Sequence, residues 1–142
     1  MKVRDVMTDA VIRINPDESV SVAARTLEHY NIGVLPVCGY DGKVCGVVTD
    51  RDLVTRCLAA NRSPADTKVS DVMTMQITSA GPDMELHVAA QLMGRQQVRR
   101  LPVVENGRLC GMVSLGDLAR KDESAGDVVD ALCDISNNVS QR

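Results

Sequence analysis

Residues 46–52 read Gly46-Val47-Val48-Thr49-Asp50-Arg51-Asp52, and residues 111–117 read Gly111-Met112-Val113-Ser114-Leu115-Gly116-Asp117. Both segments keep a glycine, two apolar residues, a hydroxyl residue and an aspartate three positions after the hydroxyl. The apolar runs Val44 to Val48 and Leu109 to Val113 suit buried strands, and each hydroxyl lies where a helix N-cap belongs. The sequence therefore predicts, twice, a strand that leads directly into a helix.

The hydroxyl and the aspartate of each segment have two interpretations. Thr49-x-x-Asp52 and Ser114-x-x-Asp117 match the capping box, in which the acid accepts a hydrogen bond from the N–H of the cap residue. The same groups also suit a nucleotide, because a helix N-terminus attracts phosphate, a hydroxyl donates to it, and a carboxylate accepts from both hydroxyls of a ribose. Spacing alone favours the cap, and the repetition of the motifs along the chain is what favours a nucleotide site.

The repetition extends over most of the chain. Asp5-Val6-Met7-Thr8 returns as Asp71-Val72-Met73-Thr74, and Leu35-Pro36-Val37 returns as Leu101-Pro102-Val103, in both cases 66 residues later. The offset falls to 65 between Gly46 and Gly111, which indicates that the first hairpin loop is one residue longer. A unit of this size cannot bury both faces of a small sheet alone. We therefore expect two copies packed as a pseudo-twofold pair with two equivalent clefts.

Each copy is expected to contain a short first strand, a helix, a hairpin and a second helix. The first strands are placed at Val11 to Ile14 and at Ile77-Thr78, each followed by a turn that contains proline. The next helix, about Ser19 to Asn31, carries an apolar stripe at helical spacing, made of Val20, Ala23, Ala24, Leu27 and Tyr30. The second copy repeats this stripe with Leu86, Ala89, Ala90 and Met93.

The two hairpins are predicted from their turns. Asp41-Gly42 and Asn106-Gly107 each lie between apolar runs, which is a strong hairpin signal. Pro36 and Pro102 lie early in the first strand of each hairpin, where proline marks an edge or an unpaired position. We expect backbone groups at this edge to remain free and able to read the edge of a base.

The composition excludes several classes of protein. With 142 residues, no Trp or Phe and only two Tyr, the core must consist of aliphatic side chains, Met and Ala. A net charge of -3 and the lack of aromatic stacking platforms argue against nucleic-acid binding. No apolar run approaches the 18 residues of a membrane span, and the N-terminus has no signal-like apolar segment. We expect a cytoplasmic protein with no membrane partner.

The cysteines and histidines suggest no catalytic or metal site. The five cysteines form no CxxC pair, and Cys38, Cys45 and Cys110 lie in apolar strand contexts, where buried reduced thiols are expected. His29 and His87 have no potential ligand at a usable spacing and are expected on the solvated sides of helices. No nucleophile, base and orienting group occur together, and there is no phosphate-binding loop. The sequence therefore predicts neither an enzyme nor a catalytic cofactor.

Taken together, the doubled motifs Asp-Val-Met-Thr, Leu-Pro-Val and Gly-x-x-Thr/Ser-x-x-Asp resemble a tandem cystathionine-beta-synthase (CBS) domain pair, often called a Bateman module. The similarity covers about residues 3 to 120. It implies an α/β (α+β) fold of two β-α-β-β-α repeats, and a ligand that contains adenosine, such as AMP, ATP, NAD or S-adenosylmethionine. It also implies the homodimers that such modules commonly form.

By the same resemblance, Thr49 and Ser114 face phosphate, and Asp52 and Asp117 hold ribose. The adenine is then expected against the first strands and the segments before each hairpin, which comprise Val11, Ile12, Ile32, Gly33, Val34, Leu35 and Pro36 in one site and Ile77, Thr78, Val98, Arg99, Arg100, Leu101 and Pro102 in the other. Aliphatic walls of this kind suit a purine face.

The two sites differ in charge. Asp50-Arg51 in the first copy is replaced by Leu115-Gly116 in the second, whereas Arg99-Arg100 replaces Gly33-Val34. We therefore expect the two sites to bind with different affinity. Arg51 either contacts phosphate or is a solvated residue of the first helical turn. Arg99 and Arg100 alternate along a strand, so at most one of them points into a given cleft.

The predicted organisation is a first repeat at 1–60, a linker at 61–68, a second repeat at 69–120 and a helical tail at 121–142. The tail has an apolar stripe of Val128, Leu132, Ile135 and Val139, which either packs on its own module or docks on a second subunit. The predicted function is that of a stand-alone sensor of adenine nucleotides, which signals to a separate target protein. The alternative is an interaction module without a ligand, in which the Thr/Ser-x-x-Asp pairs are only helix caps.

Overall fold

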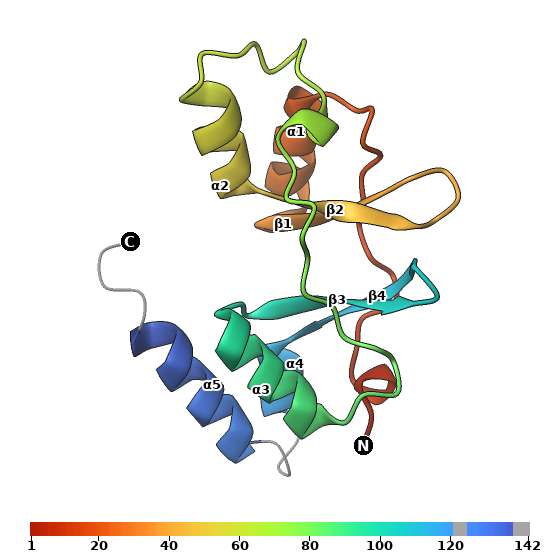
Figure 1. Ribbon diagram of the computed structural model, residues 1–142, viewed down its shortest axis with the longest axis vertical. Coiled ribbons are helices and arrows are strands. Elements are labelled where there is room, and N and C mark those ends of the chain that lie inside the picture. Colours follow the sequence, from red (N-terminus) through yellow and green to blue (C-terminus); the bar gives the residue numbers. More distant parts are fainter. Residues whose placement is uncertain (121–124, 138–142) are drawn as a thin grey trace. The chain divides into compact units, whose positions relative to one another are not determined.

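The structure, a computed structural model, describes residues 1–120 and 125–137 (Figure 1). The chain forms two compact units, one made of Ile12–Ile77 and the other made of Met1–Val11 with Thr78–Arg142. We call them the first-repeat unit and the second-repeat unit after the hairpin that each contains. Each unit takes its Asp-Val-Met-Thr segment from the other sequence repeat, because residues 5–8 belong to the unit of the second hairpin and residues 71–74 to that of the first.

The two units contain corresponding elements. The first-repeat unit holds α1 (Val20–Tyr30), β1 (Val34–Cys38), β2 (Val44–Thr49), α2 (Asp50–Leu53), the π-helical segment η2 (Val54–Leu58) and the 3-10 turn η3 (Val69–Asp71). The second-repeat unit holds the 3-10 turn η1 (Val3–Asp5), α3 (Leu86–Gln96), β3 (Arg100–Glu105), β4 (Arg108–Ser114), α4 (Leu115–Ala119) and α5 (Ala125–Asn137). The mixed helix and strand content confirms the predicted fold class.

Both predicted hairpins are present as antiparallel pairs (Figure 1). In the second, Asn106 and Gly107 have φ values of 54° and 79°, as a tight two-residue turn requires. In the first, Gly42 has a φ of 81° in the longer loop. Each hairpin contains a β-bulge next to this turn, between Val37 and Cys38 in one and between Val103 and Val104 in the other.

One edge of each hairpin is closed by a single residue. The backbone of Ile14 donates to the Pro36 carbonyl at 3.0 Å and accepts from Cys38 N–H at 2.9 Å. Ala80 bonds Pro102 and Val104 in the same way, with both distances 2.9 Å. The strands predicted at Val11 to Ile14 and at Ile77-Thr78 are therefore reduced to isolated bridges at Ile14 and Ala80. The expectation of free backbone groups at the two prolines was wrong, because each proline carbonyl has a donor.

The other edge of each hairpin is closed by an Asp-Val-Met-Thr segment. Val47 and Thr74 exchange backbone hydrogen bonds of 3.0 and 2.8 Å, and Thr8 and Met112 exchange two of 2.8 Å. This contact explains the glycine that both motifs share. A Cβ at Gly111 would lie 2.9 Å from the Thr8 carbonyl oxygen, and a Cβ at Gly46 would approach the Thr74 carbonyl even more closely.

Each unit has its own apolar core. In the first, the α1 residues Val20, Ala23 and Leu27 pack on the inward side of the hairpin, whereas Ala24 and Tyr30, predicted in the same stripe, are exposed. In the second, the predicted stripe is buried throughout, at Leu86, Ala89, Ala90 and Met93. The difference arises because α5 covers α3, and Gly94 lies close to Ala131 at this contact.

The C-terminal helix packs within its own unit, against α3 and α4 (Figure 1). Val128 and Ile135 are buried as predicted, but Leu132 is 39% exposed and Ala131 is buried in its place. Both spacings follow the helical period, and the buried face is the one turned toward Ala131 rather than toward Leu132. Val139 of that stripe lies outside the described residues. Within residues 1–120 and 125–137, no helix is long and apolar enough to cross a membrane.

Candidate functional site

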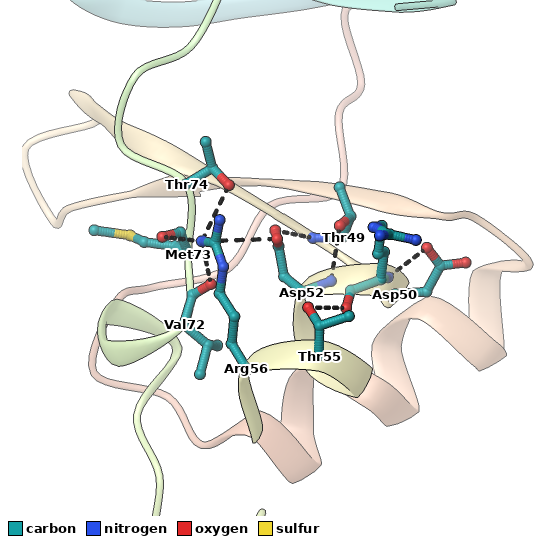
Figure 2. Close-up of polar contacts among 9 residues, drawn as sticks. Thr49, Asp50, Asp52, Thr55, Arg56, Val72, Met73 and Thr74 are labelled. Atoms are coloured by element: carbon teal, nitrogen blue, oxygen red, sulfur yellow. Dashed lines mark hydrogen bonds and ion pairs between the residues drawn. The ribbon is translucent and has the colours of Figure 1, made fainter. Parts of the chain in front are cut away.

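The first candidate site is the junction of β2 and α2. Thr49 Oγ1 accepts from the Asp52 N–H at 3.1 Å, and Asp52 Oδ2 accepts from the Thr49 N–H at 3.0 Å (Figure 2). Thr49 is extended, with φ −115° and ψ 164°, so the chain turns from strand to helix at this residue. The capping-box interpretation is therefore confirmed. Because the Thr49 hydroxyl is used here as an acceptor, its own hydrogen remains able to donate.

The second junction, between β4 and α4, has the same geometry. Ser114 Oγ accepts from the Asp117 N–H at 3.1 Å, and Asp117 Oδ2 accepts from the Ser114 N–H at 2.8 Å. Ser114 has φ −120° and ψ 163°. The change from threonine to serine at the cap, and from Asp-Arg to Leu-Gly at the start of the helix, leaves the cap hydrogen bonds intact.

The second oxygen of each carboxylate faces an arginine. Asp52 Oδ1 lies 3.7 Å from Arg56 Nη1, and Asp117 Oδ1 contacts Arg120 Nη2. Only 8% of Asp52 and 9% of Asp117 is exposed, which is low for an acid. A buried carboxylate is costly unless it is paired and hydrogen-bonded, and here the cap N–H and the arginine supply both.

Arg56 connects the first junction to the Asp-Val-Met-Thr segment of its unit. Its Nη1 donates to the carbonyls of Val72 and Met73, both at 3.0 Å, and to Thr74 Oγ1 at 3.3 Å (Figure 2). Reasoning from the sequence did not select Arg56. Its position four residues after Asp52, the spacing at which charged side chains meet on a helix, was the available signal.

The segments predicted to contact adenine lie next to the junctions. Val34 is the strand partner of Thr49, and the Gly33 carbonyl accepts from the Asp50 N–H at 3.1 Å. In the second-repeat unit, Arg100 is the partner of Ser114, and the Arg99 carbonyl accepts from the Leu115 N–H at 3.0 Å. Residues 32–36 and 98–102 therefore run beside the cap residues in their own units.

The predicted first-strand residues are divided between the units. Ile12 packs against the core of the first-repeat unit, and Thr78 begins the main part of the second-repeat unit. Val11 and Ile77 lie on the other side of the boundary from the junctions to which they were assigned. The arginines Arg51, Arg99 and Arg100 are all exposed. This exposure is compatible with either role considered for Arg51.

The histidines match expectation and the cysteines show two differences from it, because Cys110 is only half-buried and Cys45 is exposed. His29 and His87 are exposed on helices, as predicted, and Cys38 is buried, but Cys45 is exposed. Cys45 departs from the strand pattern because it lies at the β-bulge. Within the described residues, no three or more His, Cys, Asp or Glu side chains are grouped so as to hold a metal ion.

The chain matches the CBS domain family over residues 3–59 and again over residues 69–124. It is a member of the CBS domain family. The two matched segments coincide closely with the two sequence repeats, and the resemblance inferred from the doubled motifs is confirmed. The chain is also similar to the CBS domain-containing protein YhcV of Bacillus subtilis strain 168, with 41% identity over 138 residues and 95% of each protein covered.

Two solved structures support the same fold. Hypoxic Response Protein I, solved with two coordinated zinc ions, is 32% identical, with a TM-score of 0.78 over 84% of this chain and 98% of that one. The CBS domain pair of protein MJ0100, in complex with 5′-methylthioadenosine and S-adenosyl-L-methionine, is 27% identical. Its TM-score is 0.73 over 84% of this chain and 94% of that chain.

Proposed function

We propose that this CBS domain protein binds a molecule containing adenosine at its two strand-to-helix junctions and signals the occupancy to a separate target protein. The observation that carries the proposal is the duplicated junction, in which a hydroxyl with a free hydrogen lies beside a buried carboxylate. The adenosine derivatives bound by the MJ0100 domain pair support this class of ligand.

In the proposed complex, the ribose hydroxyls donate to the carboxylate oxygen that now faces arginine. At the first junction this oxygen is Asp52 Oδ1, whose 3.7 Å distance from Arg56 is longer than a hydrogen bond. The Thr49 or Ser114 hydroxyl donates to the group at the 5′ position of the ribose. The aliphatic segments 32–36 and 98–102 contact the purine. Because the exposed arginines differ between the junctions, the two sites bind with different affinity.

The ribose would compete with Arg56 for Asp52 and so affect a side chain that also holds the segment Val72 to Thr74. A shift of this kind is limited by the difference in the ligand's affinity for the two states of the protein. The conformation of residues 72–74 is therefore the proposed output of the first site.

The test measures thermal unfolding with and without AMP, ADP, ATP, NAD, S-adenosylmethionine and 5′-methylthioadenosine. A ligand at about 100 times its dissociation constant adds about 2.7 kcal/mol to the free energy of unfolding, which raises the midpoint by several degrees. We expect Asp52→Ala to remove the contribution of the first site and Asp117→Ala that of the second. The proposal fails if none of these compounds shifts the midpoint and none is released from the denatured protein.

Ser19→Ala is a matched control for the loss of a cap. Ser19 Oγ accepts from the Val22 N–H at 3.2 Å and caps α1 in the same unit as Asp52. Loss of either cap is expected to cost roughly 1 kcal/mol of stability. Only Asp52→Ala is expected to abolish the ligand-induced shift. Equal loss of the shift in both variants would indicate general destabilisation rather than a binding site.

The second candidate function is an interaction module that binds no nucleotide. It is favoured by the closed state of both capping boxes, in which hydrogen bonds and arginines already occupy the carboxylates. Val54 and Leu58, four positions apart on η2, are 54% and 57% exposed and offer an apolar contact for a second copy or a target. In this case Asp52→Ala changes stability alone, and Leu58→Asp weakens self-association measured by sedimentation. We propose that a homodimer of this protein would form through the same surface, around Val54 and Leu58.

A further inference from the structure

The residue that faces the hydroxyl across the hairpin differs between the two junctions. Val34 is the strand partner of Thr49, whereas Arg100 is the strand partner of Ser114. Residues that oppose each other in an antiparallel pair have their side chains on the same face, with Cβ atoms about 4.5 to 5.5 Å apart. The Ser114 hydroxyl therefore has an arginine beside it at the place where the Thr49 hydroxyl has a valine.

The backbone hydrogen bonds show which of the two neighbouring arginines faces Ser114 most closely. The Pro102 carbonyl and both backbone groups of Met112 bond to segments on the outer edges of the second hairpin. Arg100 and Ser114 follow two positions further along each strand, where the same orientation recurs. They form a non-hydrogen-bonded pair, in which opposing side chains lie closest. The period of two directs Arg99 to the other face, so the register selects Arg100.

The charges around the two junctions also differ. At the first, Asp50 and Arg51 are both exposed and adjacent, and Asp50 Oδ1 accepts from the Arg51 N–H at 2.8 Å, so their opposite charges offset each other. At the second, Leu115 takes the place of Asp50 and is only 6% exposed. Within residues 1–120 and 125–137, neither Arg99 nor Arg100 forms an ion pair. These two arginines make the second junction more positive than the first by two charges.

We propose, on the basis of the function proposed above, that the two junctions select different adenosine derivatives by the charge of the 5′ group. The second junction takes a nucleotide with a 5′ phosphate, to which the Arg100 guanidinium donates charge-assisted hydrogen bonds beside the Ser114 hydroxyl. The first takes a derivative whose 5′ group has no negative charge, such as 5′-methylthioadenosine, because Val34 offers that group an apolar contact and no cation.

The experiment measures the dissociation constants of AMP and 5′-methylthioadenosine for the full chain by isothermal titration calorimetry. The two probes share adenosine and differ only at the 5′ position. Asp52→Ala keeps the second junction and Asp117→Ala keeps the first, so each site is titrated alone. We expect Asp52→Ala to bind AMP about tenfold more tightly than 5′-methylthioadenosine, and Asp117→Ala to show the reverse order. Added salt should weaken AMP binding at the second junction more than binding of the uncharged probe.

Exchange of the facing residues tests the assignment to Arg100. In the chain that keeps only the second junction, Arg100→Val is expected to lower the ratio of AMP affinity to 5′-methylthioadenosine affinity about tenfold. In the chain that keeps only the first, Val34→Arg should raise this ratio by a similar factor. Arg108→Val is the matched control, because Arg108 is exposed near the turn of the same hairpin and its loss removes the same charge. This control should change the ratio by less than about twofold.

The thermal midpoints of the ligand-free variants are compared first, so that only folded proteins are titrated. Where a single-junction variant does not fold, Arg100→Val is made in the otherwise unchanged chain, in which it should weaken AMP binding at one of two sites. The selectivity is wrong if both junctions prefer the same probe, or if Arg100→Val and Arg108→Val change the ratio equally. Either result leaves the proposed function in place. If no adenosine derivative binds the unchanged chain, the proposed function fails and the selectivity fails with it.

Discussion

Gly46 and Gly111 lack a side chain, and this allows an Asp-Val-Met-Thr segment to pair with the outer edge of each hairpin. In the first-repeat unit, a Cβ at Gly46 would meet the carbonyl of Thr74 and lie 3.4 Å from Met73 Sδ. The neighbouring Val47 exchanges two backbone hydrogen bonds with Thr74, so the β2 segment and the segment that contains Thr74 cannot move apart without losing these bonds. The glycine of each motif therefore allows the close packing of two backbone segments.

Gly46→Ala is expected to lower the free energy of unfolding by about 1 to 3 kcal/mol, because the added methyl group overpacks a contact with backbone. Gly81→Ala is the control, since nothing lies within 4 Å of its added Cβ and its φ is not in the left-handed region. This control should change stability by less than about 0.5 kcal/mol or raise it slightly. Urea unfolding measures both variants. Similar values for the two would contradict the proposed role of the close approach.

At the scale of elements, the local patterns gave the hairpins and the caps correctly. Asp41-Gly42 and Asn106-Gly107 indicated the turns, and Thr49 with Asp52 indicated a helix start, because each depends on residues only a few positions apart. Ala24 and Ala90 occupy equivalent places in α1 and α3, yet only Ala90 is buried. The covering element, α5, begins 35 residues after Ala90, and no periodicity within α3 reports it.

Other features were missed for similar reasons. Cys45 is exposed because the bulge interrupts the alternation of the strand, and a bulge is not evident from apolar residues alone. Arg56 was not selected because three of its partners, Val72, Met73 and Thr74, lie at least 16 positions away in the sequence. The sequence identified the capping acids Asp52 and Asp117. It did not identify Arg56 and Arg120, because whether a flexible arginine side chain reaches an acid is not evident from sequence spacing.

The packing of α5 on α3 can be tested by placing the same charged residue on the buried face and on the exposed face of α5. Ala131 is 2% exposed, and its Cα would lie 3.2 Å from a Cβ at Gly94. Ala131→Glu places a charge in this contact and is expected to cost about 2 to 4 kcal/mol. Val129→Glu, at a residue 58% exposed, should change stability little. Thermal unfolding and hydrogen exchange of α3 measure the effect, and equal responses would argue against the observed packing.

At the scale of the whole chain, the exchange of Asp-Val-Met-Thr segments makes sequence order a poor guide to stability. Val3 is fully buried in the core of the second-repeat unit, and its N–H donates to the Met84 carbonyl at 2.8 Å. Val69, the equivalent residue 66 positions later, is fully buried in the core of the first-repeat unit. A defect at either valine should therefore appear in the hairpin of the other sequence repeat.

Val3→Ala and Val69→Ala form a matched pair, because each removes the same two methyl groups from an equivalent core position. Each is expected to cost roughly 2 kcal/mol, from lost apolar burial and the cavity left behind. Hydrogen exchange should rise most in β3 and β4 for Val3→Ala, and most in β1 and β2 for Val69→Ala, because each valine packs in the unit that holds those strands. If Val3→Ala instead loosened β1 and β2, the N-terminal segment would belong to the unit of its own repeat, and the exchange of segments would be wrong.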